Sequence, residues 1–181
     1  MASVLITGAD QGLGLEAARQ LVRAGHTVWL GSRDLSLGEA AAERVGARPV
    51  QLDVTSDESV AAAVKTVGPL DVLVNNVGIA PERSESGVAA DPMRETFEVN
   101  LFGMVRVLEA FLPLLERSAA PVVVNVSSRL ASMATMVTLR YAEAFPGMRI
   151  NAVEPGTTAE IIVRMAQIGP DGPTGGYFDA R

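Results

Sequence analysis

The segment SVLITGADQGLGLEAARQLVRAG, residues 3–25, decides the fold. It begins with a short apolar run at 3–7, passes through a glycine-rich turn at 7–14, and continues as an amphipathic stretch that ends at Gly25. A short, continuous apolar run favours a strand that is covered on both faces, whereas amphipathic periodicity favours a helix. The segment therefore predicts a strand, a tight turn and a helix.

The rest of the chain repeats this alternation of strand and helix. Further strands are predicted at 26–31, 48–54, 70–76, 120–128 and 148–156, with a seventh at Gly175–Phe178. Further helices are predicted at 34–46, 56–68, 91–117 with a kink at Pro113, and 133–145. Asp34 is the expected N-cap of the second helix and Gly46 its stop. Such alternation predicts one α/β domain over residues 1–181, with a mostly parallel sheet of six to seven strands and helices on both faces.

Composition excludes several classes of function. A net charge of −6 argues against nucleic acid or an anionic membrane as a partner. The chain has no cysteine and one histidine, His26, which excludes a thiolate or histidine metal cluster and a Ser-His triad. We expect no metal site, no membrane span and no signal peptide, and hence a soluble, cytoplasmic protein.

The glycine-rich turn TGADQGLG, residues 7–14, lies between the first strand and the first helix. Backbone N–H groups at the start of a helix bind phosphate, and glycines allow a diphosphate to approach the backbone. A glycine-rich turn without a ligand is the alternative. Its position at the carboxyl edge of a parallel sheet favours nucleotide binding. The backbone at Gly8, Gly12 and Gly14 is expected to bind the diphosphate, and Gln11 and Leu13 of the same turn are also expected to bind the cofactor.

The pattern T-G-x-x-x-G-x-G resembles that of the short-chain dehydrogenase/reductase family. Further segments agree in family order: LDV at 52–54, NNVG at 75–78, FEVNLFG at 97–103, VVVNVSS at 122–128 and RINAVEPGTT at 149–158. The resemblance covers nearly the whole chain. It implies a single doubly wound (Rossmann-type) domain and hydride transfer between a nicotinamide cofactor and a carbonyl or alcohol substrate.

The resemblance also assigns roles to individual residues. The adenine is expected at Asp53 and Val54. The remaining cofactor-binding residues implied by the motifs are Asn75, Asn76, Gly78, Pro155, Gly156 and Thr158. The catalytic residues implied by the motifs are Ser128, which would orient the substrate oxygen, and Asn100, which would help to hold a water relay.

Both catalytic assignments have a structural alternative. Ser128 could satisfy backbone groups at the end of a strand. Asn100 could be a buried amide that braces its helix. The surrounding motifs favour the catalytic assignment for both residues.

The choice of cofactor depends on the segment GSRD, residues 31–34, at the end of the second strand. A carboxylate in this place would bind a ribose 2′-hydroxyl and repel a 2′-phosphate. Gly31 and Ser32 leave room, and the Arg33 guanidinium could pair with a phosphate, which favours NADP(H) over NAD(H). Alternatively, Arg33 is a solvated loop residue and Asp34 only caps the next helix.

Tyr141 has the spacing of the family's catalytic tyrosine from Ser128, but its surroundings do not match. In the family a lysine follows four residues later and lowers the phenol pKa from about 10. Here that position is Phe145, and the only lysine in the chain is Lys65. Tyr141 also stands close in sequence to Pro155. In the family, the catalytic tyrosine lies at the beginning of its helix, whereas a residue this close to the corresponding proline lies near the end of that helix. We interpret Tyr141 as a packing or surface residue.

At two points, near 132/133 and near 159/160, the sequence passes directly from one family segment to a later one. Segments that the family carries in between are therefore missing at these two joins. The first falls where the family carries Tyr-x-x-x-Lys, and the second where it carries the substrate-binding lid. Our hypothesis is that the sequence omits mobile segments of a longer, active enzyme. A measured mass near 19 kDa for the protein would contradict this hypothesis.

Two functions remain open at this point. One is an NADP(H)-dependent oxidoreductase of the family, acting on a small carbonyl or alcohol compound, and the placement of the joins favours it. The other is a non-catalytic dinucleotide-binding sensor or scaffold, which the absence of the tyrosine–lysine pair favours. The helices at 91–117 and 133–145 resemble the family's contact helices, which implies a homodimer or homotetramer.

Overall fold

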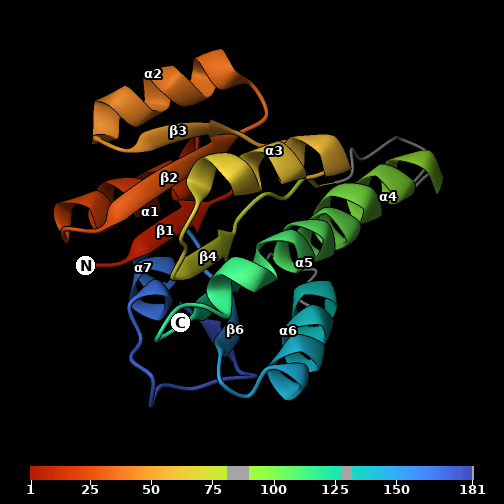
Figure 1. The fold of residues 1–181 in the computed structure, drawn as a ribbon. Helices are drawn as coiled ribbons and strands as arrows, with labels where there is room; N and C mark the ends of the chain where they lie inside the picture. Colours follow the sequence, from red (N-terminus) through yellow and green to blue (C-terminus); the bar gives the residue numbers. More distant parts are fainter. Residues whose placement is uncertain (81–89, 128–131, 181) are drawn as a thin grey trace.

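The computed structural model of the protein describes residues 1–80, 90–127 and 132–180. Within these residues, seven parallel strands form one sheet in the order β3-β2-β1-β4-β5-β6-β7 (Figure 1). The strands are β1 Ser3–Ile6, β2 Thr27–Ser32, β3 Arg48–Gln51, β4 Val72–Asn75, β5 Val122–Val126, β6 Arg149–Glu154 and β7 Tyr177–Asp179. Strand order reverses between β1 and β4, so the predicted doubly wound parallel sheet is confirmed.

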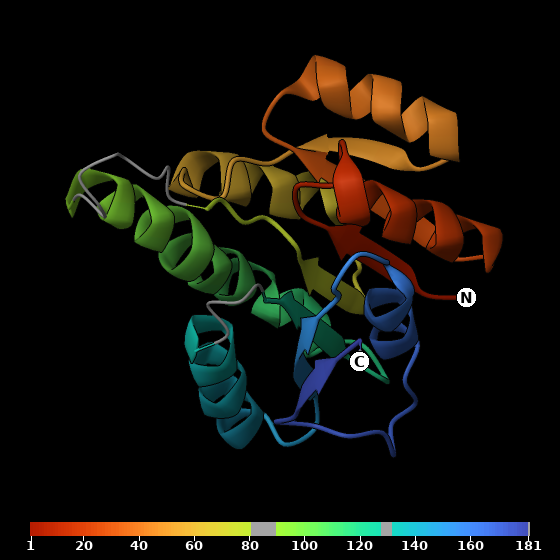
Figure 2. The ribbon, with the colours of Figure 1, turned by 180° about the vertical axis from the view of Figure 1, so that it is seen from behind.

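Helices cover both faces of the sheet, as Figures 1 and 2 show from opposite sides. They are α1 Gly12–Arg23, α2 Leu35–Val45, α3 Asp57–Val67, α4 Ala90–Phe97, the π-helical segment Glu98–Gly103, α5 Met104–Leu115, α6 Ser132–Ala144 and α7 Glu160–Ala166. Buried residues of α1, α2 and α7 pack on one face, and those of α3, α5 and α6 on the other. The protein is therefore a three-layer α/β/α domain.

The aliphatic strands are the physical reason for this arrangement. Val72, Leu73 and Val74 of β4 are all buried, although successive side chains of a strand point to opposite faces. Both faces of the sheet must therefore be covered. Helix α5 contributes the fully buried Phe111 to one of these layers. Burial of one such side chain stabilises the fold by about 1.5–3 kcal/mol.

Local signals set several element boundaries where the sequence predicts them. The Asp34 carboxylate accepts a hydrogen bond from Leu37 N at 3.1 Å and caps α2, which ends at Gly46 with φ of 77°. Strand β3 is shorter than predicted, because Asp53 forms a side-chain turn: its Oδ1 accepts from Thr55 N at 2.9 Å. This Asx-turn bends the chain away from the extended conformation.

The predicted helix at 91–117 is helical from Ala90 to Leu115, but it is not uniform. Residues 98–103 have π-helical hydrogen bonding, which the periodicity of the sequence did not indicate. Pro113 lies inside α5, which continues past it to Leu115. The long helix is therefore irregular at residues 98–103, the segment that contains Asn100.

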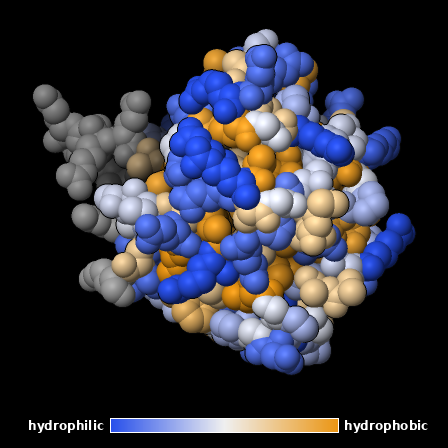
Figure 3. Space-filling model, turned by 90° about the vertical axis from the view of Figure 1, so that its left-hand side faces the viewer, coloured by the Kyte–Doolittle hydropathy of each residue, from blue (hydrophilic) through white to orange (hydrophobic). Residues whose placement is uncertain are grey.

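Polar and apolar side chains are interspersed on the face shown in Figure 3, which is the left-hand side of Figure 1. Among the helices that the structure describes, none combines the length and the apolar character needed to cross a bilayer.

A chain of buried amides joins the sheet to α6. Asn75 Nδ2 donates to Asn125 Oδ1 at 3.0 Å, and Asn125 Nδ2 donates to Thr138 Oγ1 at 2.9 Å. Asn75 and Asn125 are paired in the register of β4 and β5, and Thr138 lies on α6. All three side chains are at most 3% exposed. Because buried polar groups need partners, this chain fixes α6 at one position along β5.

We expect Asn125→Ala to lower the free energy of unfolding by about 2 kcal/mol or more, since it leaves two buried polar groups without a partner. Denaturant titration followed by circular dichroism measures this loss. The exposed Thr66→Ala on α3 is the control and should change stability by less than about 0.5 kcal/mol. Equal effects of the two substitutions would contradict a structural role for the buried chain.

Candidate functional site

The glycine-rich turn lies at the carboxyl edge of the sheet, between β1 and α1. Gly8 and Gly12 have φ of 59° and 60°, in the left-handed region that favours glycine. A Cβ on Gly8 would lie 2.7 Å from Val77 Cγ2, so this glycine is also required for packing. A Cβ on Gly12 would meet no atom within 4 Å. Gly12 therefore marks the open side of the turn.

The side-chain amide of Asn76 holds the turn in place. Its Nδ2 donates to the carbonyl oxygens of Thr7 and Gly8, both at 3.0 Å. A Cβ on Gly14 would lie only 2.5 Å from the same nitrogen. The segment after β4 therefore requires glycine at 8 and at 14. This explains why two of the three glycines predicted from the sequence are needed even without a ligand.

The start of α1 is suited to bind an anion. Gln11 is the N-cap residue, and its side chain makes no capping hydrogen bond. The first N–H groups of a helix have no partner within the helix, and they carry the positive end of its dipole. Because the neighbouring Gly12 leaves the approach open, a phosphate group fits at this position.

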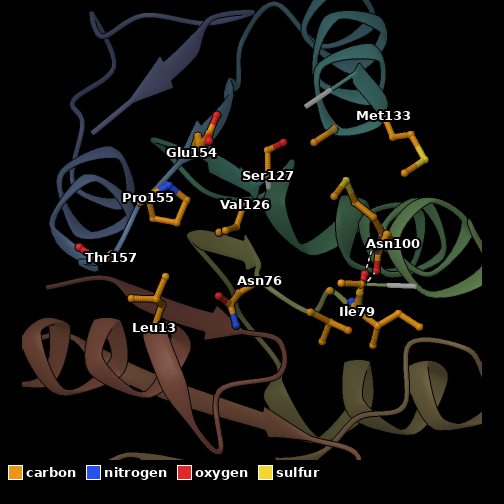
Figure 4. Close-up of a pocket in the computed structure, with 16 residues that line it drawn as sticks. Leu13, Asn76, Ile79, Asn100, Val126, Ser127, Met133, Glu154, Pro155 and Thr157 are labelled. Atoms are coloured by element: carbon orange, nitrogen blue, oxygen red, sulfur yellow. Dashed lines mark hydrogen bonds between the residues drawn. The ribbon is translucent and has the colours of Figure 1, made fainter. Parts of the chain in front are cut away.

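A cavity of about 610 Å³ lies beside this helix start (Figure 4). Predicted site residues from distant parts of the chain line it together: Leu13, Asn76, Gly78, Asn100, Pro155 and Gly156. They come from the start of α1, the ends of β4 and β6, and the π-helical segment. The carboxyl edge of a doubly wound sheet, next to the point where strand order reverses, is where such folds bind ligands.

Asn100 makes two hydrogen bonds across this cavity wall. Its Oδ1 accepts from Ile79 N at 2.8 Å, and its Nδ2 donates to Ile79 O at 2.7 Å, as the dashed lines in Figure 4 show. Asn100 therefore ties the π-helical segment to the chain after β4. It braces the structure and lines the cavity, but it is only half-buried and so is not the buried amide of the structural alternative, and its catalytic role stays a prediction. π-helical turns occur frequently at functional sites.

The structure places other predicted residues elsewhere. Asn75 is buried, and its amide is used by Asn125, so it does not line the cavity. Thr158 is exposed, and its N–H donates to Pro155 O at 3.3 Å, while its neighbour Thr157 lines the cavity. The predicted catalytic Ser128 lies outside the described residues. Its neighbour Ser127 is buried and lines the cavity.

Several lining residues were not predicted from the sequence. They are Val77, Ile79, Ala80, Met104, Val126, Ser127, Met133, Ala134, Glu154 and Thr157. Half of them, namely Val77, Ile79, Ser127, Glu154 and Thr157, are adjacent in sequence to a predicted residue, which is a usable signal. Met104 and Met133 had no such signal, because only the packing of α5 and α6 brings them to the cavity.

A second cavity, of about 750 Å³, lies along β3 and α3 and is lined by Arg33 and Asp53. Burial alone would raise the pKa of Asp53. Hydrogen bonds from the Thr55 hydroxyl and backbone N–H, with the positive charges of Arg33 and Arg106, hold that pKa below its ordinary value. Arg33 is exposed and takes part in none of the ion pairs among the described residues. A cation is therefore accessible at the end of β2.

Val54 is held by Arg106, which the sequence analysis did not single out. Arg106 Nη1 donates to Val54 O at 2.7 Å, and its guanidinium also pairs with Asp57 and with Glu98. This arginine links the end of β3, the start of α3 and the π-helical segment. It therefore positions the predicted adenine end of the site relative to Asn100.

Tyr141 does not line the cavity. Its ring stacks on Phe145 with centroids 6.1 Å apart, and its hydroxyl donates to Glu109 on α5. Burial, and then the bond to Glu109, raise the pKa of Tyr141 above its ordinary value. This position agrees with the interpretation of Tyr141 as a packing residue. Lys65, the only lysine, is exposed on α3.

No group of three or more His, Cys, Asp or Glu side chains that could hold a metal ion occurs in the part of the chain that the structure describes. The open glycine turn and the mainly apolar cavity fit an organic dinucleotide, with the diphosphate at the helix start. The fold and this site define a dinucleotide-binding α/β protein.

Comparison with known proteins identifies the family. Residues 2–149 match the short chain dehydrogenase family, and the chain therefore belongs to it. It is 34% identical to the mitochondrial D-beta-hydroxybutyrate dehydrogenase of Mus musculus, over 85% of this chain and 53% of that protein. It is 40% identical to retinol dehydrogenase 8 of Bos taurus, over 70% of this chain and 44% of that protein. The chain thus spans about half the length of these curated relatives.

A solved structure agrees with this assignment. The menthone neomenthol reductase from Mentha piperita superimposes with a TM-score of 0.88 and 26% identity, over 98% of each chain. Members of this family are oxidoreductases that bind a nicotinamide dinucleotide.

We expect Gly12→Ala to weaken NADPH binding at least tenfold, because the new methyl group points to the open side of the turn. Fluorescence titration with NADPH measures the effect. Gly25→Ala is a matched control: Gly25 also has positive φ, of 87°, and free space around its Cβ position, but it lies at the other end of α1. Equal binding by the two variants would contradict a phosphate site at Gly12.

Proposed function

We propose that the protein is an NADP(H)-dependent oxidoreductase that transfers hydride between the nicotinamide ring and the carbon of a carbonyl or alcohol substrate. One observation carries the proposal. A single cavity brings together the helix start after the glycine turn, the segment after β4, Asn100 and Pro155–Gly156. These segments are distant in sequence, so their convergence supports a common ligand.

Residues of this chain would hold the cofactor in a defined orientation. The free N–H groups at the start of α1 would bind the diphosphate, and Asp53 and Val54 would contact the adenine. Pro155 and Gly156 would form the wall against the nicotinamide. When bound, the nicotinamide ring donates or accepts the hydride. The apolar lining would keep water from the reacting carbon.

Arg33 supports NADP(H) as the cofactor. It is exposed and lies at the end of β2, where the ribose 2′ position is expected. Asp34 caps α2 through Leu37 N, so its carboxylate is already used. A 2′-phosphate would therefore meet a cation at this position, where it would compete with the Asp53 carboxylate, which lines the same cavity and already interacts with Arg33.

Reduction of a carbonyl by hydride also needs a proton donor. Tyr141 is directed to Glu109, and Lys65 is on the surface of α3, so neither serves the cavity. We propose that a longer form of the protein carries a tyrosine–lysine segment before α6 and a lid before α7. The match to the Mus musculus relative supports this: it extends over 184 positions but takes in only 85% of this 181-residue chain. The relative therefore has additional residues inside the matched region.

A second candidate function is a dinucleotide-binding sensor or scaffold without catalysis. The observation that favours it is the position of Tyr141, whose stacking partner Phe145 occupies the place of the expected lysine. Such a protein would bind NADPH but would not transfer hydride.

Incubation of the longer form of the protein with NADPH and a panel of ketones separates the two candidates. We expect loss of NADPH absorbance, and we expect Tyr141→Phe to keep the rate within about twofold, because a phenol with a raised pKa outside the cavity is no catalytic base. Tight NADPH binding without turnover would favour the sensor. A tenfold or greater loss of rate in Tyr141→Phe would contradict our placement of this residue.

We expect Arg33→Glu to weaken NADPH binding about tenfold to a hundredfold and to leave NADH binding nearly unchanged, since one charge-assisted contact is lost only with the 2′-phosphate. Competitive titration with the two cofactors measures both constants. Arg44→Glu, an exposed arginine in the last turn of α2, is the matched control and should alter neither. An unchanged preference in Arg33→Glu would refute the assignment of this arginine.

A further inference from the structure

Arg106 on α5 binds three separate acceptors with three different nitrogens. Its Nη1 donates to Val54 O at 2.7 Å, its Nη2 donates to Glu98 Oε1 at 3.0 Å, and its Nε donates to Asp57. Val54 follows β3, Asp57 begins α3, and Glu98 begins the π-helical segment. Helices α3 and α5 pack side by side on one face of the sheet (Figure 1). This side chain therefore links the turn between β3 and α3 to α5 and to the π-helical segment.

The turn at residues 53–56 has internal hydrogen bonds that fix its shape. Asp53 N donates to Ser59 Oγ at 2.9 Å, and Asp53 Oδ1 accepts from Thr55 N at 2.9 Å. Ser56 N donates to Asp53 O at 3.2 Å. These partners all belong to the turn itself or to α3. The position of the turn relative to α5 depends on other contacts.

Two contacts at Val54 place the turn against α5 and the π-helical segment. A Cβ on Gly103 would lie 2.7 Å from Val54 Cγ2, so the end of the π-helical segment lies directly against the Val54 side chain. Val54 is 5% exposed, and a buried carbonyl needs a hydrogen-bond partner. Arg106 supplies that partner. Val54 is therefore held on its apolar side by Gly103 and on its polar side by Arg106.

Charge gives Arg106 a second link to the same turn. Its side chain is 24% exposed. Burial alone would lower the pKa of Arg106, but its two carboxylate partners raise that pKa above its ordinary value, so the guanidinium stays charged. Burial would likewise raise the pKa of Asp53, but hydrogen bonds from Thr55 and the charges of Arg33 and Arg106 hold it below its ordinary value. Arg106 thus acts on both residues at which the adenine is expected.

From these contacts we infer that Arg106 is a positioning residue for the adenosine half of the cofactor. Arg106 lines neither of the two cavities described above, so it acts through Val54 and Asp53 rather than by touching the ligand. The inference rests on the proposed function, which puts the adenine at these two residues. Loss of Arg106 should therefore weaken binding of the adenosine half and spare the nicotinamide half.

The two halves of the cofactor, used as separate ligands, test the inference. Adenosine 2′,5′-bisphosphate carries the adenine but no nicotinamide, and nicotinamide mononucleotide carries the nicotinamide but no adenine. We expect Arg106→Met to raise the dissociation constant of the first about fivefold or more, because the turn loses a charge-assisted bond that holds it in place, and to change that of the second less than about twofold. Ligand-observed NMR titration measures both constants. Equal changes for the two halves, or no change for either, would overturn the inference.

Arg140→Met on α6 is the matched control. Arg140 also pairs with a carboxylate, that of Glu143, but its side chain is 79% exposed and both partners lie on the same helix. This variant removes one positive charge without altering the turn, so both ligands should bind as they do to the unaltered protein. An equal loss of adenosine 2′,5′-bisphosphate affinity in Arg106→Met and Arg140→Met would show a general charge effect and contradict the inference.

A milder substitution covers the case in which Arg106→Met does not fold, as judged by circular dichroism. Arg106→Lys keeps the positive charge, but one ammonium on a flexible stem cannot reproduce the planar fork that binds three acceptors. We expect adenosine 2′,5′-bisphosphate to bind about twofold or more weakly to Arg106→Lys, with nicotinamide mononucleotide unchanged. Binding of the adenosine ligand as tight as in the unaltered protein would overturn the inference.

Turnover separates the inference from the proposed function. In the longer form of the protein, Arg106→Met should raise the KM for NADPH and keep kcat within about twofold, because the reacting end of the cofactor is not altered. Selective loss of adenosine binding in a protein that never oxidises NADPH would support the inference and contradict the oxidoreductase. Oxidation of NADPH with an unchanged KM would support the oxidoreductase and overturn the inference. Failure of both ligands to bind the unaltered protein would overturn both.

Discussion

The two hydrogen bonds from the Asn76 amide to the carbonyls of Thr7 and Gly8 are the contact on which the site depends. They join the end of β4 to the turn after β1, where the order of the strands reverses. Because the Asn76 amide lies against the turn, position 14 has no room for a side chain, and the neighbouring Val77 leaves none at position 8. The same contact therefore shapes the phosphate-binding backbone and one wall of the cavity. Loss of this amide would affect the cofactor site and the substrate site together.

Much of the fold follows from local patterns in the sequence. Apolar runs in β4 and β5 require cover on both faces, and the glycines and caps at Gly25, Asp34 and Gly46 mark where helices begin and end. These signals are short-range, and the parallel sheet follows from their alternation. The π-helical turn at 98–103 was not predictable in this way, because the apolar periodicity of the helix carries no signal for it, and its Asn100 contacts Ile79, a residue distant in sequence.

The candidate site was predicted less completely than the fold, because part of its lining depends on contacts between residues that are distant in sequence. Motif residues such as Asn76, Asn100 and Pro155 do converge on one cavity. Asn75 and Asn76 are neighbours of the same residue type. Because successive side chains of a strand point in opposite directions, the side chain of Asn75 is directed away from the cavity and bonds to Asn125. Met104 and Met133 reach the cavity only through the packing of α5 and α6. That packing depends in turn on the buried bond between Asn125 and Thr138, for which the sequence gives no local sign.

The π-helical segment has a consequence for how the chain can vary in length. Such a segment behaves as a one-residue insertion that a helix absorbs without breaking. Each residue of an α-helix turns the chain by about 100°. Removal of one residue between 98 and 103 would restore uniform winding and leave the orientation of α4 relative to α5 nearly unchanged, because the wider turn takes up the extra residue. A one-residue deletion in a uniform α-helix would instead rotate the preceding part by that angle. The chain can therefore change its length by one residue in this stretch while the same face of α4 stays turned toward the rest of the molecule.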